Sequence, residues 1–160
     1  MKLTESRALS RTAAYCSKAE RCEYDVRKKL LLWESPEEEQ IRIIAKLKKE
    51  NFLNEERFTQ SFIRDKVRFN KWGKAKIAFE LTKKRIPRDI IQKYVADIDE
   101  QEVNDSLRKI LETKIKSVKA NNDYKKRVKL MRFALGRGFS SEQIAPILNN
   151  LIGNNDEDDY

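Results

Sequence analysis

The chain has 160 residues, of which 38% are charged and 39% are apolar, and its formal net charge is +9. The apolar share is below the range of ordinary globular domains and the charged share is above it, which favours an elongated array of small modules over one large core. The sequence contains no histidine, which excludes His-dependent catalytic triads, Cys/His zinc fingers and HExxH peptidases.

The sequence predicts an all-α protein, because glycine and proline are scarce and no run of alternating β-branched residues occurs. Capping boxes at Ser35, Asp99 and Ser140 mark helix starts. Gly136 and Gly138 suit the end of one helix and the link to the next. The predicted helices span about residues 4–20, 23–33, 36–50, 54–70, 73–84, 87–96, 99–119, 123–136 and 140–151.

A weak internal repeat groups these helices into three triplets. Apolar residues spaced five and five around a helix start occur at Leu81/Ile86/Ile91, at Ala134/Phe139/Ile144, 53 residues later, and at Leu31/Ile41, fifty residues earlier. A period near 50 residues is typical of helical repeat arrays, in which each unit completes its core against a neighbour. We therefore predict three-helix repeats over residues 1–50, 51–97 and 98–152, followed by an acidic, disordered tail over 153–160. A single irregular nine-helix domain is the alternative.

Some predicted helices carry two apolar stripes. In helix 36–50, Ile41 and Ala45 lie on one side, while Ile43 and Leu47 lie on another. A helix that is apolar on two sides is expected to have neighbours on two sides. This pattern supports the prediction of an array.

The two cysteines, Cys16 and Cys22, are six residues apart, which is not the spacing of a CxxC metal or redox pair. We interpret them as small apolar core residues in a reducing cytoplasm. No apolar run approaches the roughly 20 residues of a membrane span, and the N-terminus lacks the hydrophobic segment of a signal peptide. We therefore expect a cytoplasmic protein without a membrane partner.

Basic residues are concentrated in two blocks. Residues 66–88 contain nine basic residues and one acid, Glu80, and residues 114–137 contain nine basic residues and one acid, Asp123. Each block falls on the first two helices of a predicted triplet. A single lysine is most simply a solvated surface residue, but two same-sign blocks in register with a repeat favour a surface that binds a polyanion.

The spacing of the cations suits a phosphate backbone. Lys76 and Lys83 are seven residues apart and share the face of helix 73–84 that is turned away from Ile77 and Leu81. Such a row contacts phosphates without reading bases, so binding should depend on salt and little on sequence. The candidate nucleic-acid-binding residues are Lys66, Arg68, Lys71, Lys74, Lys76, Lys83, Lys84, Arg85, Arg88, Lys125, Lys126 and Lys129.

Two aromatic residues, Phe69 and Trp72, lie within the first basic block. An aromatic ring among cations can stack on a nucleic-acid base. The spacing of these two rings fits the seam between helices, however, so we predict that both pack against the next helix.

Nothing in the sequence indicates catalysis. Runs of acids occur at helix starts and in the tail, without the apolar surroundings that a general acid or a two-metal site needs. The segment Gly136-Arg137-Gly138 lacks the preceding strand of a phosphate loop. We expect no enzymatic activity, no metal and no cofactor.

Several motifs along the chain match those of a known family. In the middle they are Phe52–Phe58 (FLNEERF), Phe62–Lys66 (FIRDK) and Lys71–Lys74 (KWGK), and nearer the ends they are Ala14–Cys22 and Arg137–Ser140. These segments resemble the RecX family, whose members regulate the bacterial recombinase RecA. The resemblance covers about residues 8–151 and is most specific in the middle third.

The resemblance implies tandem three-helix repeats in an elongated, curved array. It implies binding in the groove of the RecA–single-stranded-DNA filament and inhibition of RecA recombinase, ATPase and coprotease activity. We also expect a monomer, with duplex DNA as a further ligand. The family has no catalytic residues. At Arg85 the family commonly has glycine, and we expect a slightly different helix ending there.

Two other functions stay open at this point. A free-standing, transcription-factor-like protein would need a recognition helix with Arg, Asn or Gln near its N-terminus. The third helix of each predicted triplet instead begins with acidic residues, at positions 37–39, 89 and 142. A helical scaffold that binds only protein would show no DNA affinity at low salt.

Overall fold

The computed structural model describes residues 2–153, and this part of the chain is all-helical, as the sequence predicts. In chain order the helices are α1 (Glu5–Lys18), α2 (Glu23–Leu32), α3 (Glu37–Lys49), α4 (Glu55–Asp65), the π-helical turn η1 (Lys66–Asn70), α5 (Lys74–Lys83), α6 (Arg88–Ala96), α7 (Glu100–Ile115), α8 (Asp123–Gly136) and α9 (Ser141–Ile152). The predicted helices agree with these bounds to within a few residues. Apart from Gly153, the predicted acidic tail lies outside the described residues.

The predicted helix 54–70 changes its winding at Lys66. The α-helical part, α4, ends at Asp65, and the chain continues as the wider turn η1. Lys71 then takes a left-handed conformation, with φ of 54°. The N–H of Trp72 donates to the carbonyl of Lys66 at 3.0 Å and closes the turn. No glycine or proline marks this ending, so local sequence signals could not reveal it.

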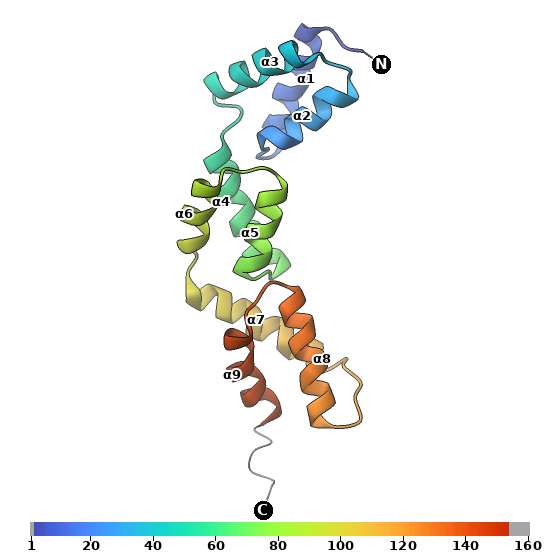
Figure 1. Cartoon of the computed structure of the whole chain (residues 1–160), viewed down its shortest axis with the longest axis vertical. Helices are drawn as coiled ribbons and strands as arrows, with labels where there is room; N and C mark the ends of the chain where they lie inside the picture. Colours follow the sequence, from blue (N-terminus) through green and yellow to red (C-terminus); the bar gives the residue numbers. More distant parts are fainter. Residues whose placement is uncertain (1, 154–160) are drawn as a thin grey trace, which may run out of the picture. The chain divides into compact units, whose positions relative to one another are not determined.

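The chain forms two compact units that share helices. One unit comprises the residues up to Phe62 together with Leu81–Ile91, and the other comprises Ile63–Glu80 and the residues from Gln92 onward. Helices α4, α5 and α6 therefore run from one unit into the other. Helices α1–α3 belong to the first unit, and α7–α9 belong to the second (Figure 1).

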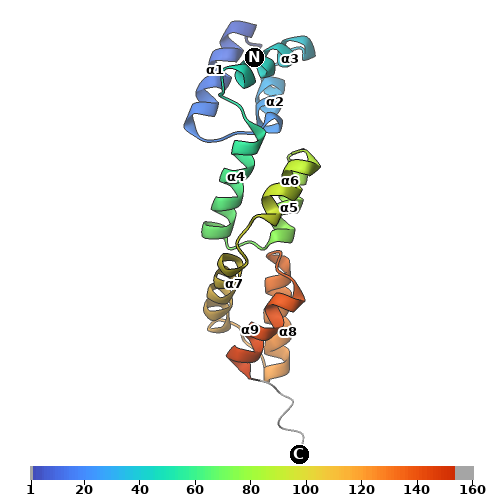
Figure 2. The ribbon, with the colours of Figure 1, turned by 90° about the vertical axis from the view of Figure 1, so that its left-hand side faces the viewer.

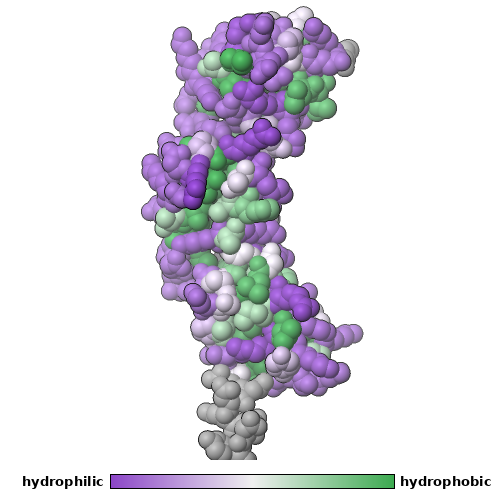
Figure 3. All heavy atoms as spheres, viewed as in Figure 1, coloured by the Kyte–Doolittle hydropathy of each residue, from purple (hydrophilic) through white to green (hydrophobic). Residues whose placement is uncertain are grey.

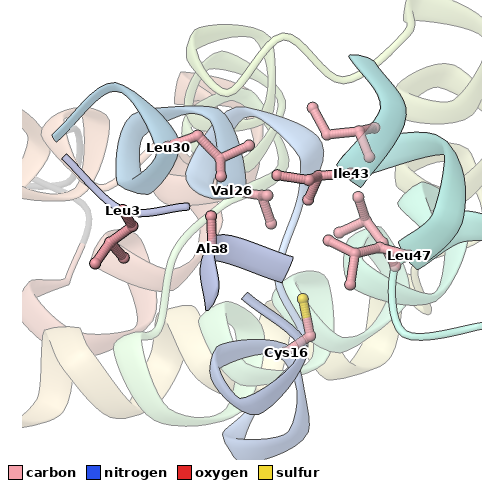
Figure 4. Close-up of a cluster of buried hydrophobic side chains, with 9 residues drawn as sticks. Leu3, Ala8, Cys16, Val26, Leu30, Ile43 and Leu47 are labelled. Atoms are coloured by element: carbon pink, nitrogen blue, oxygen red, sulfur yellow. The ribbon is translucent and has the colours of Figure 1, made fainter. Parts of the chain in front are cut away.

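In the first unit, α1, α2 and α3 pack against one another. Their apolar sides meet in a cluster of buried side chains that includes Leu3, Ala8, Cys16, Val26, Leu30, Ile43 and Leu47 (Figure 4). Each fully buried aliphatic side chain of this kind contributes about 1.5–3 kcal/mol relative to exposure. The N-terminal segment is fixed to this core by a hydrogen bond from the Leu3 N–H to the Trp33 carbonyl at 3.2 Å.

In the second unit, α7 contacts η1, α8 and α9, and α8 packs against α9 (Figure 2). The buried hydroxyl of Ser106 on α7 donates to the carbonyl of Val67 at 3.0 Å, which gives the π-helical turn a fixed partner. The core of this unit includes the buried side chains of Val103, Leu107, Leu111, Leu130, Ala134, Phe139, Ile144 and Leu148.

The same backbone turn ends α2, α5 and α8. In each turn one residue is left-handed: Glu34 (φ 57°), Arg85 (φ 58°) or Gly138 (φ 97°). The next N–H then donates to the carbonyl five residues back, in the pairs Ser35–Leu30 (3.0 Å), Ile86–Leu81 (3.2 Å) and Phe139–Ala134 (3.3 Å). This is the Schellman ending, which satisfies carbonyls that a helix end leaves without partners. Its recurrence after α2, α5 and α8 gives the repeat a common backbone feature. The helix α3 ends in the same way, with Asn51 at φ 64° and the Phe52 N–H donating to the Leu47 carbonyl at 2.9 Å. The expectation of a different ending at Arg85 is wrong.

The turn also corrects the register of the first repeat by one residue. The positions equivalent to Leu81, Ile86 and Ile91 are Leu30, Ser35 and Gln40, all of which are buried. The predicted equivalents, Leu31 and Ile41, are instead 64% and 54% exposed. Hydrophobic spacing missed the register because two of the three buried positions carry polar residues.

Two further predictions for α3 are wrong. Ser35 is not its N-cap, because the helix begins at Glu37 after Pro36 and the Ser35 side chain is buried at the end of the preceding turn. Ile41 and Ala45, the second predicted apolar stripe, are both exposed and do not form a buried contact side. By contrast, Ser140 forms the complete capping box predicted for the start of α9.

Candidate nucleic-acid interface

The turn between α8 and α9 docks on the start of α5 by backbone contacts within the second unit. The Gly73 N–H donates to the Arg137 carbonyl at 2.8 Å, and the Ala75 N–H donates to the Gly138 carbonyl at 3.3 Å. These bonds satisfy N–H groups that the first turn of a helix cannot pair internally. A Cβ on Gly73 would lie 2.3 Å from the Gly138 oxygen, and a Cβ on Gly138 would lie 2.5 Å from the Lys76 Cβ. Only glycine allows this approach.

Two predicted cations lie near an aromatic ring that precedes α5. The Lys66 ammonium lies 4.8 Å from the centroid of the Trp72 ring, and the Lys76 ammonium lies 4.6 Å from it. These distances are in the range of cation–π attraction. Trp72 is half-buried, whereas Phe69 is 79% exposed. The prediction that Phe69 packs against the next helix is therefore wrong.

A hollow of about 330 Å³ lies beside this docked turn, between α7 and α8. We call it the cationic hollow, and it is lined by Lys71, Lys109, Ile110, Thr113, Lys114, Ser117, Phe133 and Arg137. None of these eight lining residues is acidic. Figure 3 shows a largely hydrophilic surface, with apolar patches over the α1–α3 and α4–α6 groups as well as over the α7–α9 group.

Two other predicted cations of the second unit are paired with acids at the start of α7. Arg68 contacts Glu102 at 3.3 Å, and Lys74 contacts Glu100. Both acids are substantially exposed, so each pair contributes little to stability. The pairs lower the net positive charge that Arg68 and Lys74 present to a polyanion.

The predicted lysines on α8 lie near its start. Asn122 caps the helix by accepting a hydrogen bond from the Lys125 N–H at 2.8 Å. Lys125 and Lys129 are exposed, and Lys126 is half-buried. The Lys129 ammonium donates to the carbonyl of Lys119, which ties the α7–α8 connection to α8.

The remaining predicted residues, Lys83, Lys84, Arg85 and Arg88, lie in the first unit. Lys84 is engaged internally, because its ammonium donates to Asp25 at 2.9 Å. Lys83, Arg85 and Arg88 are exposed. The structure thus divides the twelve candidates between the two units, and it gives Lys84 a structural contact.

The electrostatics of the Lys84–Asp25 pair reflect both burial and charge. Burial by itself raises the pKa of Asp25 and lowers that of Lys84. The hydrogen bond and the opposite charge outweigh burial, so the pKa of Asp25 is lowered and that of Lys84 is raised. Both groups therefore stay charged at neutral pH.

The cationic hollow contains residues that were not among the candidates: Lys109, Lys114, Phe133 and Arg137. Lys114 and Arg137 belong to the second basic block, but their proximity depends on how α7 and the α8–α9 turn pack. Lys109 lies outside both blocks. For Arg137 a further sequence signal was Gly138, because its suitability for a helix ending predicts the turn that holds Arg137.

Other site chemistries find no support in residues 2–153. Cys16 and Cys22 are buried and unbonded to each other, as predicted. Burial raises the pKa of the Cys22 thiol to about 12 and also raises that of Cys16.

Within the described residues, no group of His, Cys, Asp and Glu is placed to hold a metal ion. No helix in this part of the chain has both the length and the apolar composition needed to cross a bilayer.

These features define a class of protein: an all-α protein built from three-helix repeats with a shared helix ending and a cationic, partly aromatic surface. Comparison with protein families gives the particular one. Residues 54–94 match the family model of the second three-helix domain of RecX, and residues 100–148 match that of its third three-helix domain.

Curated relatives and solved structures agree with this match. The regulatory protein RecX of Clostridium beijerinckii is 31% identical over 145 residues, covering 89% of this chain and 67% of its own length. That of Clostridium perfringens is 33% identical over 115 residues, covering 71% of this chain and 53% of its own length. A crystal structure of regulatory protein RecX matches with a TM-score of 0.82 at 22% identity, covering 89% of this chain and 72% of that one. The crystal structure of RecX from Lactobacillus salivarius matches with a TM-score of 0.76 at 22% identity, covering 92% of this chain and 96% of that one.

The chain therefore belongs to the RecX family. It spans about half to two thirds of the length of these two Clostridium relatives. The two solved structures, at 22% identity, establish the likeness of fold.

Proposed function

We propose that this chain is a RecX-like regulator that binds the RecA–single-stranded-DNA filament and inhibits RecA strand exchange, ATP hydrolysis and coprotease activity. The observation that supports it is membership of the RecX family, whose curated relatives are named regulatory proteins. In this role the chain acts in the cytoplasm, in DNA repair and the SOS response, as a monomer without a cofactor or a membrane partner.

The second unit supplies a chemical reason for DNA to be part of the target. Two lysine ammonium groups lie 4.8 and 4.6 Å from the centroid of the Trp72 ring, and the cationic hollow combines cations with Phe133. Grooves that bind single strands combine positive charge along the backbone with aromatic rings near the bases. A RecA–DNA filament offers such a strand together with protein.

RecA-dependent ATP hydrolysis on single-stranded DNA, titrated with this chain, tests the proposal. We expect the rate to fall at amounts well below one chain per RecA subunit, because one bound regulator affects a filament of many subunits. An unchanged rate at equimolar amounts would contradict regulation of RecA, and a raised rate would contradict inhibition.

Paired charge reversals test whether the basic blocks contact the filament. Lys76→Glu with Lys83→Glu leaves the buried Ile77 in place, so the fold should survive while binding weakens and its salt dependence becomes shallower. The matched control is Lys46→Glu with Lys49→Glu, two exposed lysines on α3. If the control proved as damaging as the first pair, the assignment of the binding surface to the basic blocks would be wrong.

A second pair, Lys125→Glu with Lys129→Glu, should act in the same direction as the first. The sequence of the DNA should matter little, because contacts to phosphates carry no base information. A strong preference for one duplex sequence, without an effect on RecA, would instead support a free-standing transcription-factor-like protein.

We also propose that the repeats extend over residues 1–50, 51–97 and 98–152. The exposed residues Asn51, Asp97 and Asp99 in the connections are then the places where limited proteolysis should first cut the folded chain. Early cleavage inside α2 or α8 would contradict these boundaries.

A further inference from the structure

We propose that the cationic hollow binds one unstacked nucleotide of a single strand, with its base on the Phe133 ring and its flanking phosphates held by Lys71, Lys114 and Arg137. The inference rests on the proposed function, because it assigns the part of the surface that contacts DNA. The nucleotide site is separate from the surface that contacts RecA protein, and the sequence does not assign the residues of that surface.

The cations of the hollow converge on the ring from different segments. The Lys114 ammonium on α7 lies 5.1 Å from the centroid of Phe133, and the Arg137 guanidinium after α8 lies 5.2 Å from it. Lys71 enters the lining from the residue that follows η1. The ring therefore lies within a group of charges that a phosphate next to a stacked base could reach.

Two of these cations are already held in place. One guanidinium nitrogen of Arg137 donates to the Asn70 carbonyl at 2.9 Å, and the Arg137 carbonyl accepts from the Gly73 N–H. The Lys71 ammonium donates to the Arg68 carbonyl, which fixes its side chain near the turn. Groups that are ordered before binding lose less conformational entropy on association, so the site gains affinity from its rigidity.

The composition of the hollow favours a nucleotide over other anions. A free phosphate would not use the aromatic ring, and an acidic peptide would not need the flat face of Phe133. Thr113 and Ser117 add hydroxyl groups to the lining. The volume of about 330 Å³ is at the lower end of ligand sites, which suits a single nucleotide. Bases of a duplex are stacked on each other and unavailable, so the site selects single strands.

Binding of short oligothymidylate, compared with an abasic oligonucleotide of the same length over a range of salt concentrations, tests the site. Stacking of one base on an aromatic ring corresponds to about 5- to 150-fold in affinity. Phe133→Leu should weaken oligothymidylate binding by a factor in this range, leave the salt slope unchanged and reduce the preference for oligothymidylate over the abasic strand. Lys114→Gln should instead make the slope of log K against log[salt] shallower by about 0.7.

Tyr124→Leu is the matched control for loss of an aromatic ring. Tyr124 lies on α8, nine residues before Phe133 and thus on the opposite side of the helix, and it is 68% exposed. Its removal should change neither affinity nor the preference for bases. Helix content and thermal unfolding of each variant show whether it is folded. If Phe133→Leu does not fold, the Lys114→Gln variant tests the site instead, because Lys114 is exposed and its loss should make the slope of log K against log[salt] shallower.

Three results would overturn the site. They are unchanged oligothymidylate binding by Phe133→Leu, equal losses for Phe133→Leu and Tyr124→Leu, and an unchanged salt slope for Lys114→Gln. A separate result would contradict the proposed function. If Phe133→Leu weakens oligothymidylate binding as expected but the unmodified chain leaves RecA ATP hydrolysis unchanged, the chain has the nucleotide site without the regulatory role. A Phe133→Leu variant that binds oligothymidylate normally and still inhibits RecA has the role without the site.

Discussion

The α5–α6 turn of the first unit and the α8–α9 turn of the second have the same backbone but make their contacts by different means. Each is attached to the start of an earlier helix. In the first unit the contact uses side chains, because Lys84 pairs with Asp25 and Arg85 lies 5.8 Å from the Tyr24 ring. In the second unit the contact uses the backbone, because Gly138 approaches Lys76 without a side chain between them.

This difference decides where charge is available. In the first unit, Lys84 forms an ion pair with Asp25, so the charge of this turn stabilises the fold. In the second unit, the close backbone contact leaves Arg137 to line the cationic hollow beside Lys114. The same repeated turn thus stabilises the fold in one place and positions a candidate binding residue in the other.

The largest effect is expected for glycine in the α8–α9 turn. Gly138→Ala puts a Cβ 2.5 Å from Lys76 at a positive φ, which should lower the free energy of unfolding by about 3 kcal/mol. Gly136→Ala is the control, because its Cβ would meet nothing within 4 Å, and it should be neutral or stabilise by up to about 1 kcal/mol. Urea unfolding measures both. Equal stabilities would show that the backbone contact is not needed.

A smaller effect is expected at the side-chain contact of the first unit. Lys84→Met leaves Asp25 half-buried without its charged partner and should lower the free energy of unfolding by about 1–3 kcal/mol at pH 7. Lys83→Met, at an exposed position next to it, should change stability by less than about 0.5 kcal/mol. A loss as large at Lys83 would argue against a specific pair.

The pH dependence of the Lys84 variant tests the ionic nature of this contact. The pKa of Asp25 is lowered, so the pair's contribution is complete above the ordinary aspartate pKa of about 4 and is lost as the pH falls through the lower folded value. The pKa of Lys84 is raised, so the contribution is lost again only above the ordinary lysine pKa of about 10. The stability difference between wild type and Lys84→Met should therefore shrink at acidic pH. A constant difference down to pH 2 would contradict the ion pair.

At Arg85 the expected effect is smaller still. The left-handed conformation costs a residue with a side chain about 1–2 kcal/mol, and glycine avoids this cost but loses more entropy on folding. Arg85→Gly should consequently be more stable than Arg85→Ala by about 1 kcal/mol, both having lost the contact with Tyr24. Thermal unfolding compares the two. If alanine were equally stable, the turn would have relaxed out of the left-handed region.

The smallest expected effect is on the rate at which the two buried thiols are labelled, and it shows whether the two units open separately. Cys16 and Cys22 lie in the first unit, and burial raises the pKa of both thiols, so neither should react with a thiol reagent at pH 8 until that unit opens. Lys84→Met should speed their labelling, whereas Gly138→Ala should leave it nearly unchanged. Equal acceleration by both variants would show that the units open together.

Local sequence signals determined most of the secondary structure. The capping box at Ser140 and the turn signal at Gly138 depend on neighbours within a few residues, and both appear as predicted. The all-α class followed from the scarcity of turn residues and strand patterns. The family motifs Phe52–Phe58 and Lys71–Lys74 identified the relatives that the comparisons found.

Tertiary packing decided what short-range patterns could not contain. Ser35 and Gln40 hold core positions because the preceding turn points them inward, although neither is apolar. Phe69 is exposed because the π-helical turn rotates it away from the seam that helical spacing predicted. Arg137 joins Lys109 and Lys114 of α7 only because α7 packs against α8 and the α8–α9 turn docks on Gly73. A basic block can be counted along the chain, but which of its charges meet an aromatic ring and which meet an acid depends on contacts between residues far apart in sequence.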